Sequence, residues 1–281
     1  MPKTARKRKT PITNIPSAST SSCKPESTRA VIRRFHVLLK RQAQLKKLVV
    51  HDLAQRTELA NVEGEIEELG LENYQKMSAI GQRSDRGGGS EKILIRWLKD
   101  KEMHKTERKL KLLEVGALKP DNYDDCSTWI EATPMDLNSR HPSILEQDFL
   151  LLDEEMNREK WDLISLSLVL NFVPEPPDRG RMLRLSNIFL VEDGHLFVAL
   201  PLPCLANSRY LDFDLFTSLM TFLGFTELQR RWRKDGKMVY YLFQKKTDVK
   251  TPSRERLVVP ERFTKKITLR QGNRNNFSIL L

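Results

Sequence analysis

Apolar residues in the second half of the chain form short continuous runs instead of alternating with polar residues. We predict a strand at each of these runs, which cover residues 109–117, 128–135, 145–149, 161–173, 195–202, 226–233 and 237–243. Continuous apolar runs are typical of parallel strands that are covered on both faces. Helices are expected between the later strands, at 177–189 and 213–223. The pattern therefore predicts a parallel α/β sheet.

The last two runs are joined by Lys-Asp-Gly, at residues 234–236. A short connection that contains glycine favours a tight antiparallel hairpin. A dinucleotide-binding sheet does not end in such a hairpin, whereas the class I Rossmann-like sheet of S-adenosylmethionine-dependent methyltransferases does. We therefore predict that fold class. Pro120 and the short gap to residue 128 predict that the usual first helix is shortened or replaced by a loop.

Before residue 109 the pattern becomes helical. Apolar residues between 29 and 69 recur at steps of three and four, which predicts two helices, the first basic and the second acidic. The basic helix is interpreted either as lying along a phosphate backbone or as presenting a solvated face. Three glycines at 87–89 precede Ser90 and a predicted helix at 91–99. Such a helix N-terminus is a candidate anion site, although most such sequences are simple loops.

Four segments are expected from these patterns. Residues 1–28 are rich in Ser, Thr, Pro and Lys, which predicts a disordered basic tail. The run ARKRK at residues 5–9 has the composition of a nuclear import signal, so we expect a nuclear protein. A helical region at 29–108, a methyltransferase domain at 109–246 and a basic tail at 247–281 complete the division.

Charge is distributed unevenly along the chain. Residues 1–50 carry 13 Lys and Arg against one acid, and residues 245–281 carry 10 against three. Since the total is +11, the residues between them carry a net charge of −8. Basic ends on an acidic body are typical of nucleic-acid binding, because Lys and Arg release the counterions condensed on phosphates. Charged tails that only maintain solubility are the alternative interpretation.

Length and composition exclude several classes of protein. A chain of 281 residues with 39% hydrophobic content can bury one substantial core. It has no apolar run long enough to predict a membrane span, and its basic N-terminus does not resemble a secretory signal. The three cysteines and five histidines are scattered, so neither a disulfide framework nor a metal site is expected.

Three successive strand ends carry residues that suit a nucleoside cofactor, and ligands of a doubly wound sheet bind beyond such ends. The first strand ends with Glu114 and then Gly116, where glycine allows a ligand to approach the backbone. Asp136 follows the second strand, twenty residues later, where an acid binds ribose hydroxyls. Asp148 and Phe149 follow the third and suit an adenine amino group and ring. These five residues are our predicted cofactor site.

The fourth strand leads into Asn-Phe-Val-Pro at residues 171–174. Adenine methyltransferases that act on the amino group carry Asn-Pro-Pro-aromatic here, which supplies a polar acceptor, a rigid backbone and a stacking ring. We predict Asn171, Phe172 and Pro174 as catalytic residues, and the changed order fits a different target atom on a similar base. Transfer to a ring nitrogen would depend on proximity and charge placement. A buried strand followed by a Pro-rich turn is the alternative.

The loop after the fifth strand contains Cys204, Arg209 and Tyr210. A nucleophilic cysteine, as in pyrimidine C5 methylation, needs an activating neighbour, and enzymes that use one generally keep a second Cys nearby. No second Cys lies near Asn171, so Cys204 is interpreted as structural. Arg209 and Tyr210 are the predicted contacts to RNA phosphate and base.

Seven short motifs together resemble those of the fungal 25S rRNA adenine-N(1) methyltransferases. They are YQKMSAIGQ, RGGGSEKILIRWL, LLEVGAL, MDLNS, QDFL, SLVLNFVP and PLPCLANSRYL, and they span residues 74–243. The resemblance implies S-adenosylmethionine as cofactor, large-subunit rRNA as partner, and a nucleolar role in ribosome biogenesis. It places the family's cofactor glycine on Gly116 and its cofactor acid on Asp136. The reduced glycine loop, and Gly89 where a polar residue is expected, depart from the pattern.

Two functions from different classes follow from this resemblance. The first is methyl transfer to N(1) of an adenine in large-subunit rRNA, on free RNA or on a pre-ribosome. The second is a non-catalytic S-adenosylmethionine sensor, because animal relatives act as such sensors upstream of TOR kinase. The basic ends favour the enzyme, since a sensor has no phosphates to neutralise. No feature indicates oligomerisation, so we expect a monomer.

Overall fold

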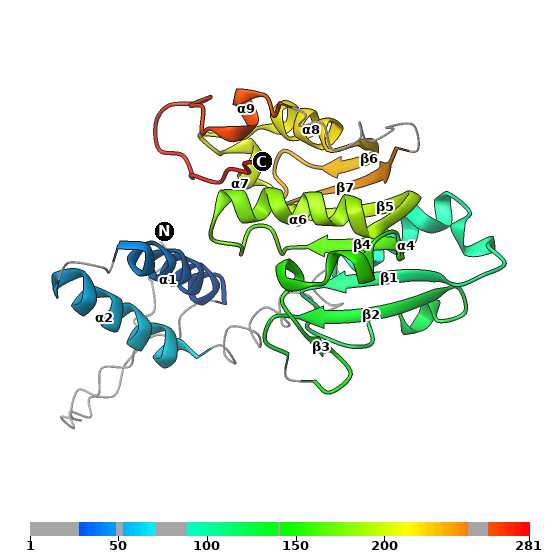
Figure 1. Ribbon diagram of the computed structural model, residues 1–281, viewed down its shortest axis with the longest axis horizontal. Helices are drawn as coiled ribbons and strands as arrows, with labels where there is room; N and C mark the ends of the chain where they lie inside the picture. Colours follow the sequence, from blue (N-terminus) through cyan, green and yellow to red (C-terminus); the bar gives the residue numbers. More distant parts are fainter. Residues whose placement is uncertain (1–27, 49–52, 71–88, 140, 247–257) are drawn as a thin grey trace, which may run out of the picture.

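The computed structural model describes residues 28–48, 53–70, 89–139, 141–246 and 258–281. Its centre is a seven-stranded sheet with the order β3-β2-β1-β4-β5-β7-β6 (Figure 1). The strands are β1 (Leu110–Val115), β2 (Ile130–Asp136), β3 (Leu145–Glu146), β4 (Trp161–Ser167), β5 (Leu190–Pro201), β6 (Phe225–Trp232) and β7 (Met238–Lys245). β7 pairs antiparallel with both β5 and β6, and the other pairs are parallel. This topology confirms the predicted class I Rossmann-like sheet with its C-terminal antiparallel hairpin.

Helices cover both faces of the sheet. Three of them have ten or more residues: α4 (Glu91–Asp100), α6 (Pro176–Phe189) and α8 (Phe213–Phe222). The shorter ones are α5 (Glu154–Asn157), α7 (Pro203–Ala206) and α9 (Glu261–Thr264), with 3-10 turns η2 (Met103–Lys105), η3 (Asp124–Cys126) and η4 (Phe149–Leu151). Between β1 and β2 the chain forms only η3, as expected from Pro120. A loop with one 3-10 turn therefore replaces the usual first helix.

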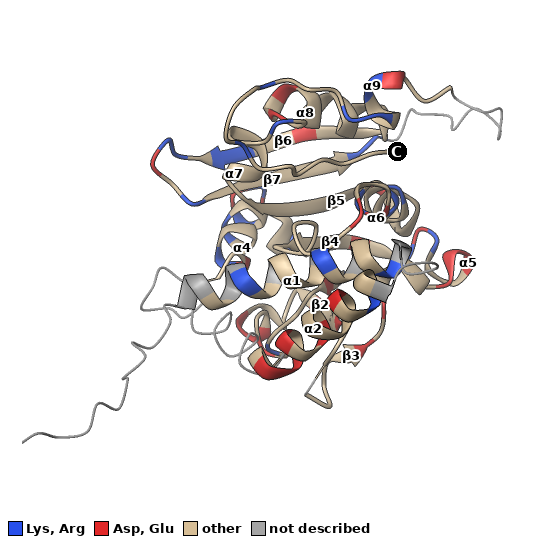
Figure 2. Cartoon of the chain, turned by 90° about the vertical axis from the view of Figure 1, so that its left-hand side faces the viewer, with Lys and Arg blue, Asp and Glu red and all other residues tan. Residues whose placement is uncertain are grey.

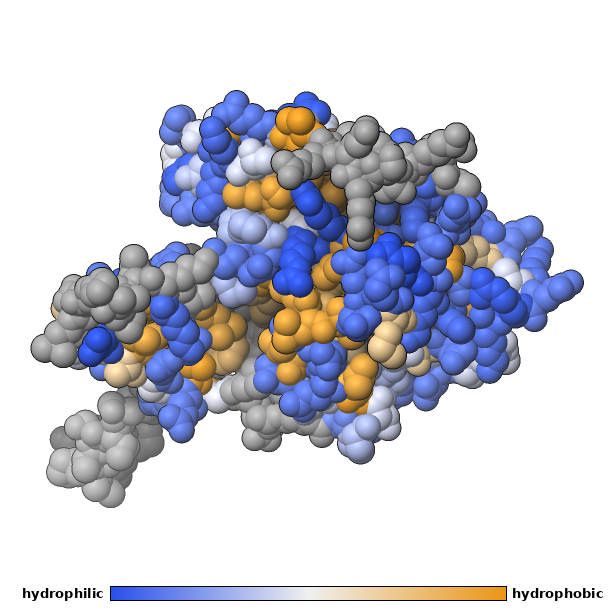
Figure 3. All heavy atoms as spheres, in the orientation of Figure 1, coloured by the Kyte–Doolittle hydropathy of each residue, from blue (hydrophilic) through white to orange (hydrophobic). Residues whose placement is uncertain are grey.

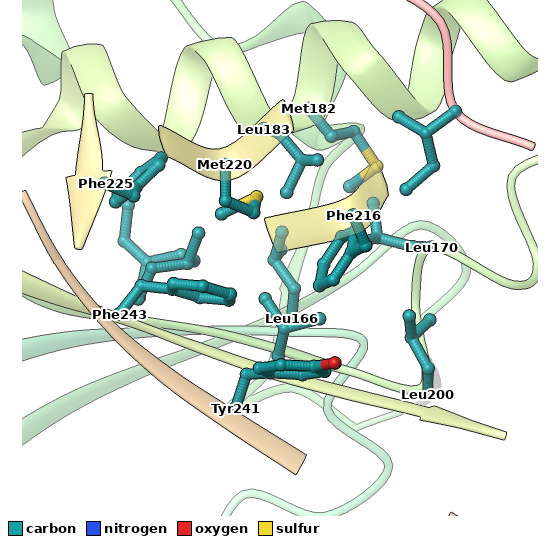
Figure 4. Packing of buried hydrophobic residues seen from close by; sticks show 14 of the residues in the cluster. Leu166, Leu170, Met182, Leu183, Leu200, Phe216, Met220, Phe225, Tyr241 and Phe243 are labelled. Carbon is teal, nitrogen blue, oxygen red and sulfur yellow. The ribbon is translucent and has the colours of Figure 1, made fainter. Parts of the chain in front are cut away.

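Two hydrophobic cores lie on the opposite faces. α6 and α8 close the larger one, in which Leu183, Met220 and Phe243 point toward one another (Figure 4). α4 closes the smaller one through Leu94 and Trp97, because its apolar residues recur at helical spacing and share one face. Each face of the central strands is thus buried, which explains why their sequences are continuously apolar.

Three strand boundaries differ from the prediction by three residues or more. β3 ends at Glu146 instead of residue 149, because Phe149 begins the 3-10 turn η4. β4 ends at Ser167, because Leu168 takes a left-handed conformation (φ 58°) and the chain turns away from the sheet. β5 begins at Leu190, directly after α6, although a strand was expected only from residue 195. The apolar residues on either side of this junction fit a buried helix and a buried strand equally well.

The N-terminal part of the described chain is a helical hairpin of α1 (Thr28–Leu48) and α2 (Leu53–Leu69). Leu38, Leu45 and Val62 form its core. The hairpin lies in front of the carboxyl ends of β1, β2 and β4 (Figures 1 and 2). Hydrophobic side chains gather on the part of the body nearest to it (Figure 3). The predicted two helices are confirmed, whereas the predicted disordered segment, up to residue 27, lies outside the described residues.

Residues 258–281, expected as part of a basic tail, pack on the domain instead. Phe263, Phe277 and Ile279 are buried in the larger core. The backbone N–H of Leu280 donates to the carbonyl oxygen of Pro176 at 3.0 Å, which fixes the chain end to the start of α6. Apolar residues at 263, 277 and 279 give this segment enough surface to bury, so its charge did not decide its structure. No helix in the described ranges is long and apolar enough to cross a membrane.

Candidate functional site

The carboxyl ends of β1, β2 and β4 form one edge of the sheet, and Gly116 lies at its centre. The backbone N–H groups of Gly116 and Ala117 both donate to the carbonyl oxygen of Met135, at 2.8 and 3.0 Å. Gly116 has a φ of 77°, and a Cβ there would lie 2.8 Å from Cγ2 of Val169. Both facts require glycine, since other residues rarely adopt this φ and no side chain fits. No side chain of its own therefore covers the backbone of residue 116 at this edge.

Glu114 belongs to a buried polar cluster on the α4 side of the sheet. Its Oε1 accepts a hydrogen bond from Nδ2 of Asn122 at 2.7 Å. Burial raises the pKa of Glu114 to about 7, opposed by the Asn122 hydrogen bond and reinforced by the charge of Glu91. Tyr123, also buried, forms a hydrogen bond to Ser165, the residue beside Glu114 on β4. Glu114 thus lies beneath the edge among fixed partners.

The N-terminus of α4 meets the same edge. The hydroxyls of Ser90, just before α4, and Ser167, at the end of β4, form a short hydrogen bond. Gly89 leaves room for the carboxylate of Glu91, because a Cβ there would lie 1.9 Å from Oε2 of that residue. A side chain at Gly89 would displace this carboxylate, which is the flexible end of Glu91. The rest of the predicted glycine loop, 87–88, lies outside the described residues.

Asp136 ends β2, next to Gly116 on β1. Its Oδ1 accepts from the backbone N–H of Asn138 at 2.9 Å. Partial burial raises the pKa of Asp136, and the neighbouring charge of Glu146 adds to the rise while the Asn138 hydrogen bond opposes it. The backbone N–H of Gln147 donates to the Asp136 carbonyl, which holds the following loop against the strand end. This carboxylate is a partly exposed acceptor at the predicted place.

The third strand end matches the prediction less well. Oδ1 of Asp148 accepts from the backbone N–H of Leu150 at 2.8 Å, so this carboxylate caps the turn η4. Phe149 is only 3% exposed and packs edge-on against Phe189, with ring centroids 5.6 Å apart. A ring buried to this degree presents little surface to a ligand, which argues against the predicted stacking on adenine. The contact of Asp148 with an adenine amino group stays a prediction.

Asn171 lies in the loop after β4, at the same edge. It is 6% exposed, and its Oδ1 has no hydrogen-bond partner within the part of the chain that the structure describes. Such an unpaired buried acceptor is costly, and in functional sites it is often completed by a ligand. The turn that follows is closed by the backbone N–H of Phe172, which donates to the carbonyl oxygen of Val169 at 2.8 Å. Asn171 therefore offers a pre-positioned acceptor.

Arg179 holds this loop in place, and sequence reasoning did not single it out. Its guanidinium donates to the carbonyl oxygens of Val173 at 2.8 Å and Pro174 at 2.9 Å, and also to that of Ser278. It lies 4.6 Å from the ring centroid of Phe277. In the sequence Arg179 looks like one more helix cation, so only its burial, at 2% exposed, reveals the role.

The predicted substrate residues, Arg209 and Tyr210, lie in the loop after β5. The side chain of Arg209 is hydrogen-bonded to the C-terminal segment. Arg209 donates to Oδ1 of Asn276 at 2.9 Å and to the carbonyl oxygen of Gly272 at 3.1 Å. These bonds argue against Arg209 as a freely available phosphate ligand. The ring of Tyr210 is partly exposed, with the cations of Arg209 and Lys266 each 5.8 Å from its centroid. Cys204 is buried, in line with the structural interpretation.

A groove of about 320 Å³ lies apart from this edge, over β1 and β2. It is lined by residues such as Lys111, Thr133 and Trp161. None of the predicted site residues lines it. Among the residues that the structure describes, no group of three or more His, Cys, Asp or Glu side chains is arranged to hold a metal ion.

The strand order, the single antiparallel strand β7 and the carboxyl edge with its glycine and acid define a class I Rossmann-like methyltransferase. Residues 60–279 match the model of the Bmt2 family, described as "25S rRNA (adenine(2142)-N(1))-methyltransferase". The chain belongs to this family, which confirms the resemblance found in its sequence.

Two curated relatives agree with this membership. The chain is 37% identical over 224 residues to a 25S rRNA adenine-N(1) methyltransferase of Schizosaccharomyces pombe, covering 76% of this chain and 79% of the relative. It is 33% identical over 261 residues to the 25S rRNA (adenine(2142)-N(1))-methyltransferase of Saccharomyces cerevisiae, covering 91% of this chain and 73% of the relative. Both relatives are described as enzymes, and neither is described as a sensor.

Solved structures are more distant. An S-adenosylmethionine-dependent methyltransferase from Clostridium acetobutylicum is 12% identical with a TM-score of 0.47, covering 62% of this chain and 99% of that chain. The 1,6-didemethyltoxoflavin-N1-methyltransferase of Burkholderia thailandensis, solved with S-adenosylhomocysteine, is 15% identical with a TM-score of 0.44, covering 56% and 76%. Likeness at this level carries no conclusion beyond the topology already described.

Proposed function

We propose that the protein transfers a methyl group from S-adenosylmethionine to N(1) of an adenine in 25S rRNA. The observation that carries the proposal is the family match over residues 60–279 on a chain whose sheet brings Gly116, Asp136 and Asn171 to one edge. The sensor alternative gains no support, because both relatives are described as methyltransferases.

The residues of the edge fit the cofactor. Gly116 leaves the backbone bare at the end of β1. Oδ2 of Asp136 has no hydrogen bond to a described residue, so it can accept from a ribose hydroxyl while Oδ1 stays fixed by Asn138. Oδ2 of Asp148, next to η4, likewise has no hydrogen bond to a described residue. When bound, S-adenosylmethionine supplies an electrophilic methyl group on a positively charged sulfonium.

Asn171 and Phe172 would orient the base. The unpaired Oδ1 of Asn171 can accept a hydrogen bond from the exocyclic amino group of adenine, which is bonded to the carbon next to N(1). N(1) attacks through its lone pair and loses no proton, so no general base is needed. The adenine becomes positively charged, and the carbonyl dipole of Asn171 favours that charge. The ring of Phe172 is partly exposed and offers a surface on which the base can stack.

The setting of the reaction belongs to the same proposal. The ARKRK run at residues 5–9 supports a nuclear protein, and an rRNA substrate supports the nucleolus, where ribosomes are assembled. We place the reaction on rRNA during ribosome biogenesis, by a protein that acts as a monomer. Fractionation of a tagged chain over a sucrose gradient would separate free protein from protein on pre-ribosomes.

Primer extension on 25S rRNA tests the proposed activity. A methyl group on N(1) blocks Watson–Crick pairing and stops reverse transcriptase at the modified adenine. A null strain should lose one stop, and the wild-type gene should restore it. Retention of every stop in the null strain would refute the assignment.

Variants of the site give a sharper test in the same assay. Asp136→Asn should weaken binding of S-adenosylmethionine by roughly 10- to 100-fold, because charge-assisted hydrogen bonds to the ribose are lost. Asn171→Ala should leave cofactor affinity unchanged and remove the stop. Asp100→Asn is the matched control, an exposed acid at the far end of α4. Isothermal titration measures the affinities.

A further inference from the structure

The tip of the β6–β7 hairpin carries exposed cations that have no ion-pair partner among the described residues. The segment RRWRKDGK covers residues 230–237 and contains a single acid, Asp235. The side chain of Arg230 pairs with Glu227 at 3.4 Å. The other four cations form no ion pair or hydrogen bond through their side chains to any residue the structure describes; they are Arg231, Arg233, Lys234 and Lys237. We call these four side chains the hairpin cations.

Three basic residues of the helical α1–α2 hairpin, unlike the hairpin cations of β6–β7, form ion pairs within their own hairpin. Arg34, Arg41 and Lys46 on α1 each form an ion pair with a glutamate of α2, at 3.0, 2.6 and 3.1 Å. Their charge is therefore largely neutralised inside the hairpin. The expectation that the first helix lies along a phosphate backbone is weakened for these three residues, whose charge is directed at α2. The hairpin cations have no such partner in the part of the chain that the structure describes.

The hairpin cations lie at the same edge of the sheet as the candidate site. β6 runs parallel to β5, so its C-terminal end is at the carboxyl edge. Met238 pairs with Pro201, the last residue of β5, and the backbone N–H of Leu202 donates to the carbonyl oxygen of Lys237 at 2.8 Å. Figure 2 looks onto this edge and shows the blue hairpin tip projecting beside α7.

Trp232 adds an exposed ring to the same tip. Its side chain is among the few exposed large hydrophobic groups, at 43% exposure. The ring packs on Phe213 at the start of α8, with centroids 5.0 Å apart and planes tilted by 31°. A ring that is supported on one side and open on the other can stack on a base. Cations around an aromatic ring are the composition of a single-stranded nucleic-acid surface.

We propose that the hairpin cations bind the phosphate backbone of the RNA next to the target adenine, and that Trp232 stacks on an unpaired base of the same strand. The inference rests on the proposed function for the identity of the RNA. Adenine N(1) is accessible only when the base is unpaired, so the strand around it is single-stranded where it enters the site. A cationic tip at the same edge would hold that strand while the base reaches Asn171.

Salt-dependent binding of a 25S rRNA transcript tests the proposal. The quadruple variant Arg231→Gln, Arg233→Gln, Lys234→Gln, Lys237→Gln removes four positive charges. Each phosphate contact contributes about 0.7 to the slope of log K against log salt on single strands. We therefore expect the slope to fall by about 3 and the affinity to fall by about 100-fold at low salt. The KM for RNA should rise while the affinity for S-adenosylmethionine and kcat at saturating RNA stay unchanged.

A matched control removes four charges from the opposite edge. Lys99, Lys101, Lys109 and Lys160 are exposed, form no ion pair with a described residue, and lie at the end of α4 or at the starts of β1 and β4. Their replacement by Gln should change the slope by less than 1. Equal losses in both variants would mean that only net charge matters, and an unchanged slope in the hairpin variant would also overturn the proposal. Binding is read independently of methyl transfer, so an inactive wild type would refute the function without deciding the surface.

Trp232 is tested by a pair of substitutions. Trp232→Ala should weaken RNA binding about tenfold at any salt concentration, because stacking does not depend on counterions. Trp232→Phe keeps a ring on Phe213 and should recover most of the affinity. If alanine and phenylalanine variants bind equally, the stacking role is wrong. Thermal unfolding of both variants identifies any loss that comes from the packing on Phe213.

Discussion

The guanidinium of Arg179 donates a hydrogen bond to the carbonyl oxygen of Ser278, 99 residues further along the chain. The same group donates to the carbonyl oxygens of Val173 and Pro174, in the loop that follows Asn171. Burial lowers the pKa of Arg179 to about 10, which still leaves it charged at neutral pH. One charged side chain therefore connects the C-terminal segment to the loop with the predicted catalytic residues.

Removal of this group should affect stability and catalysis together. Arg179→Ala leaves three carbonyl oxygens without their donor, and we expect the free energy of unfolding to fall by roughly 3 kcal/mol. kcat should fall because the Asn171 loop loses its support, while the affinity for S-adenosylmethionine changes little. Chemical denaturation, single-turnover methyl transfer and calorimetry measure the three quantities.

Two further variants make the Arg179 test specific. Arg179→Lys keeps the charge but cannot reach three acceptors with a planar fork, so its kcat should stay low. Arg184 is an exposed cation on the same helix α6, so Arg184→Ala should leave the free energy of unfolding and kcat unchanged. Normal kcat in Arg179→Ala at a temperature where the protein is folded would show that the loop needs no such support.

Gly180 allows the C-terminal segment to lie against α6. A Cβ at Gly180 would lie 1.8 Å from the carbonyl oxygen of Leu280. Gly180→Ala should therefore destabilise the protein by roughly 2 kcal/mol, although alanine is the better helix former. Gly64→Ala on α2 meets no atom of a described residue within 4 Å and should stabilise that helix by about 1 kcal/mol. Hydrogen exchange along α6 and α2 measures both, and a stabilised Gly180→Ala would contradict the packing.

The strands and their parallel sheet could be predicted because buried parallel strands produce continuous apolar runs that need no long-range information. Arg179 could not be found in this way, since its three acceptors are defined only after residues 173–174 and 278 meet. Whether a cation finds an ion-pair partner also could not be predicted from the local sequence. Arg34 and Arg231 are alike in sequence, but only the fold gives Arg34 a glutamate on α2, whereas Arg231 pairs with no acid among the described residues.

The residues of the candidate site also differ in how far the sequence could predict their positions. Gly116 and Asp136 follow directly from their places after strands, so their positions at one edge were predictable. The place of Phe149 could not be decided from the sequence, because an aromatic residue after a strand is equally suited to a ligand and to the core. Its contact with Phe189 on α6 depends on tertiary packing that no local pattern contains.

Gly116 should tolerate no side chain, for two reasons that can be separated. Gly116→Ala combines an unfavourable φ of 77° with a contact of 2.8 Å to Val169. Gly272 has a φ of 89°, and a Cβ there would meet no atom of the described residues within 4 Å, so Gly272→Ala tests the backbone strain alone. We expect a loss of about 1 kcal/mol for Gly272→Ala and roughly 3 kcal/mol for Gly116→Ala. Equal losses in urea unfolding would mean that Val169 moves freely aside.

Glu114 should make stability depend on pH. Its pKa is raised from 4.5 to about 7, chiefly by burial, so the folded protein binds this proton more tightly than the unfolded chain does. The contribution is fully present below pH 4.5 and is lost as pH rises through about 7, with a total of roughly 3 kcal/mol. His195 acts in the opposite direction, because burial lowers its pKa from 6.5 to about 4 and its contribution is lost as pH falls.

Glu114→Gln separates the two groups. Glutamine keeps an oxygen that can accept from Asn122 but does not titrate. The unfolding free energy of the wild type minus that of the variant cancels the His195 contribution, since both proteins contain it. This difference should fall by roughly 3 kcal/mol between pH 4.5 and 7, and change little above that range. Denaturant titrations at half-unit pH steps measure it, and a constant difference would mean that the pKa of Glu114 is the same in the folded and the unfolded protein.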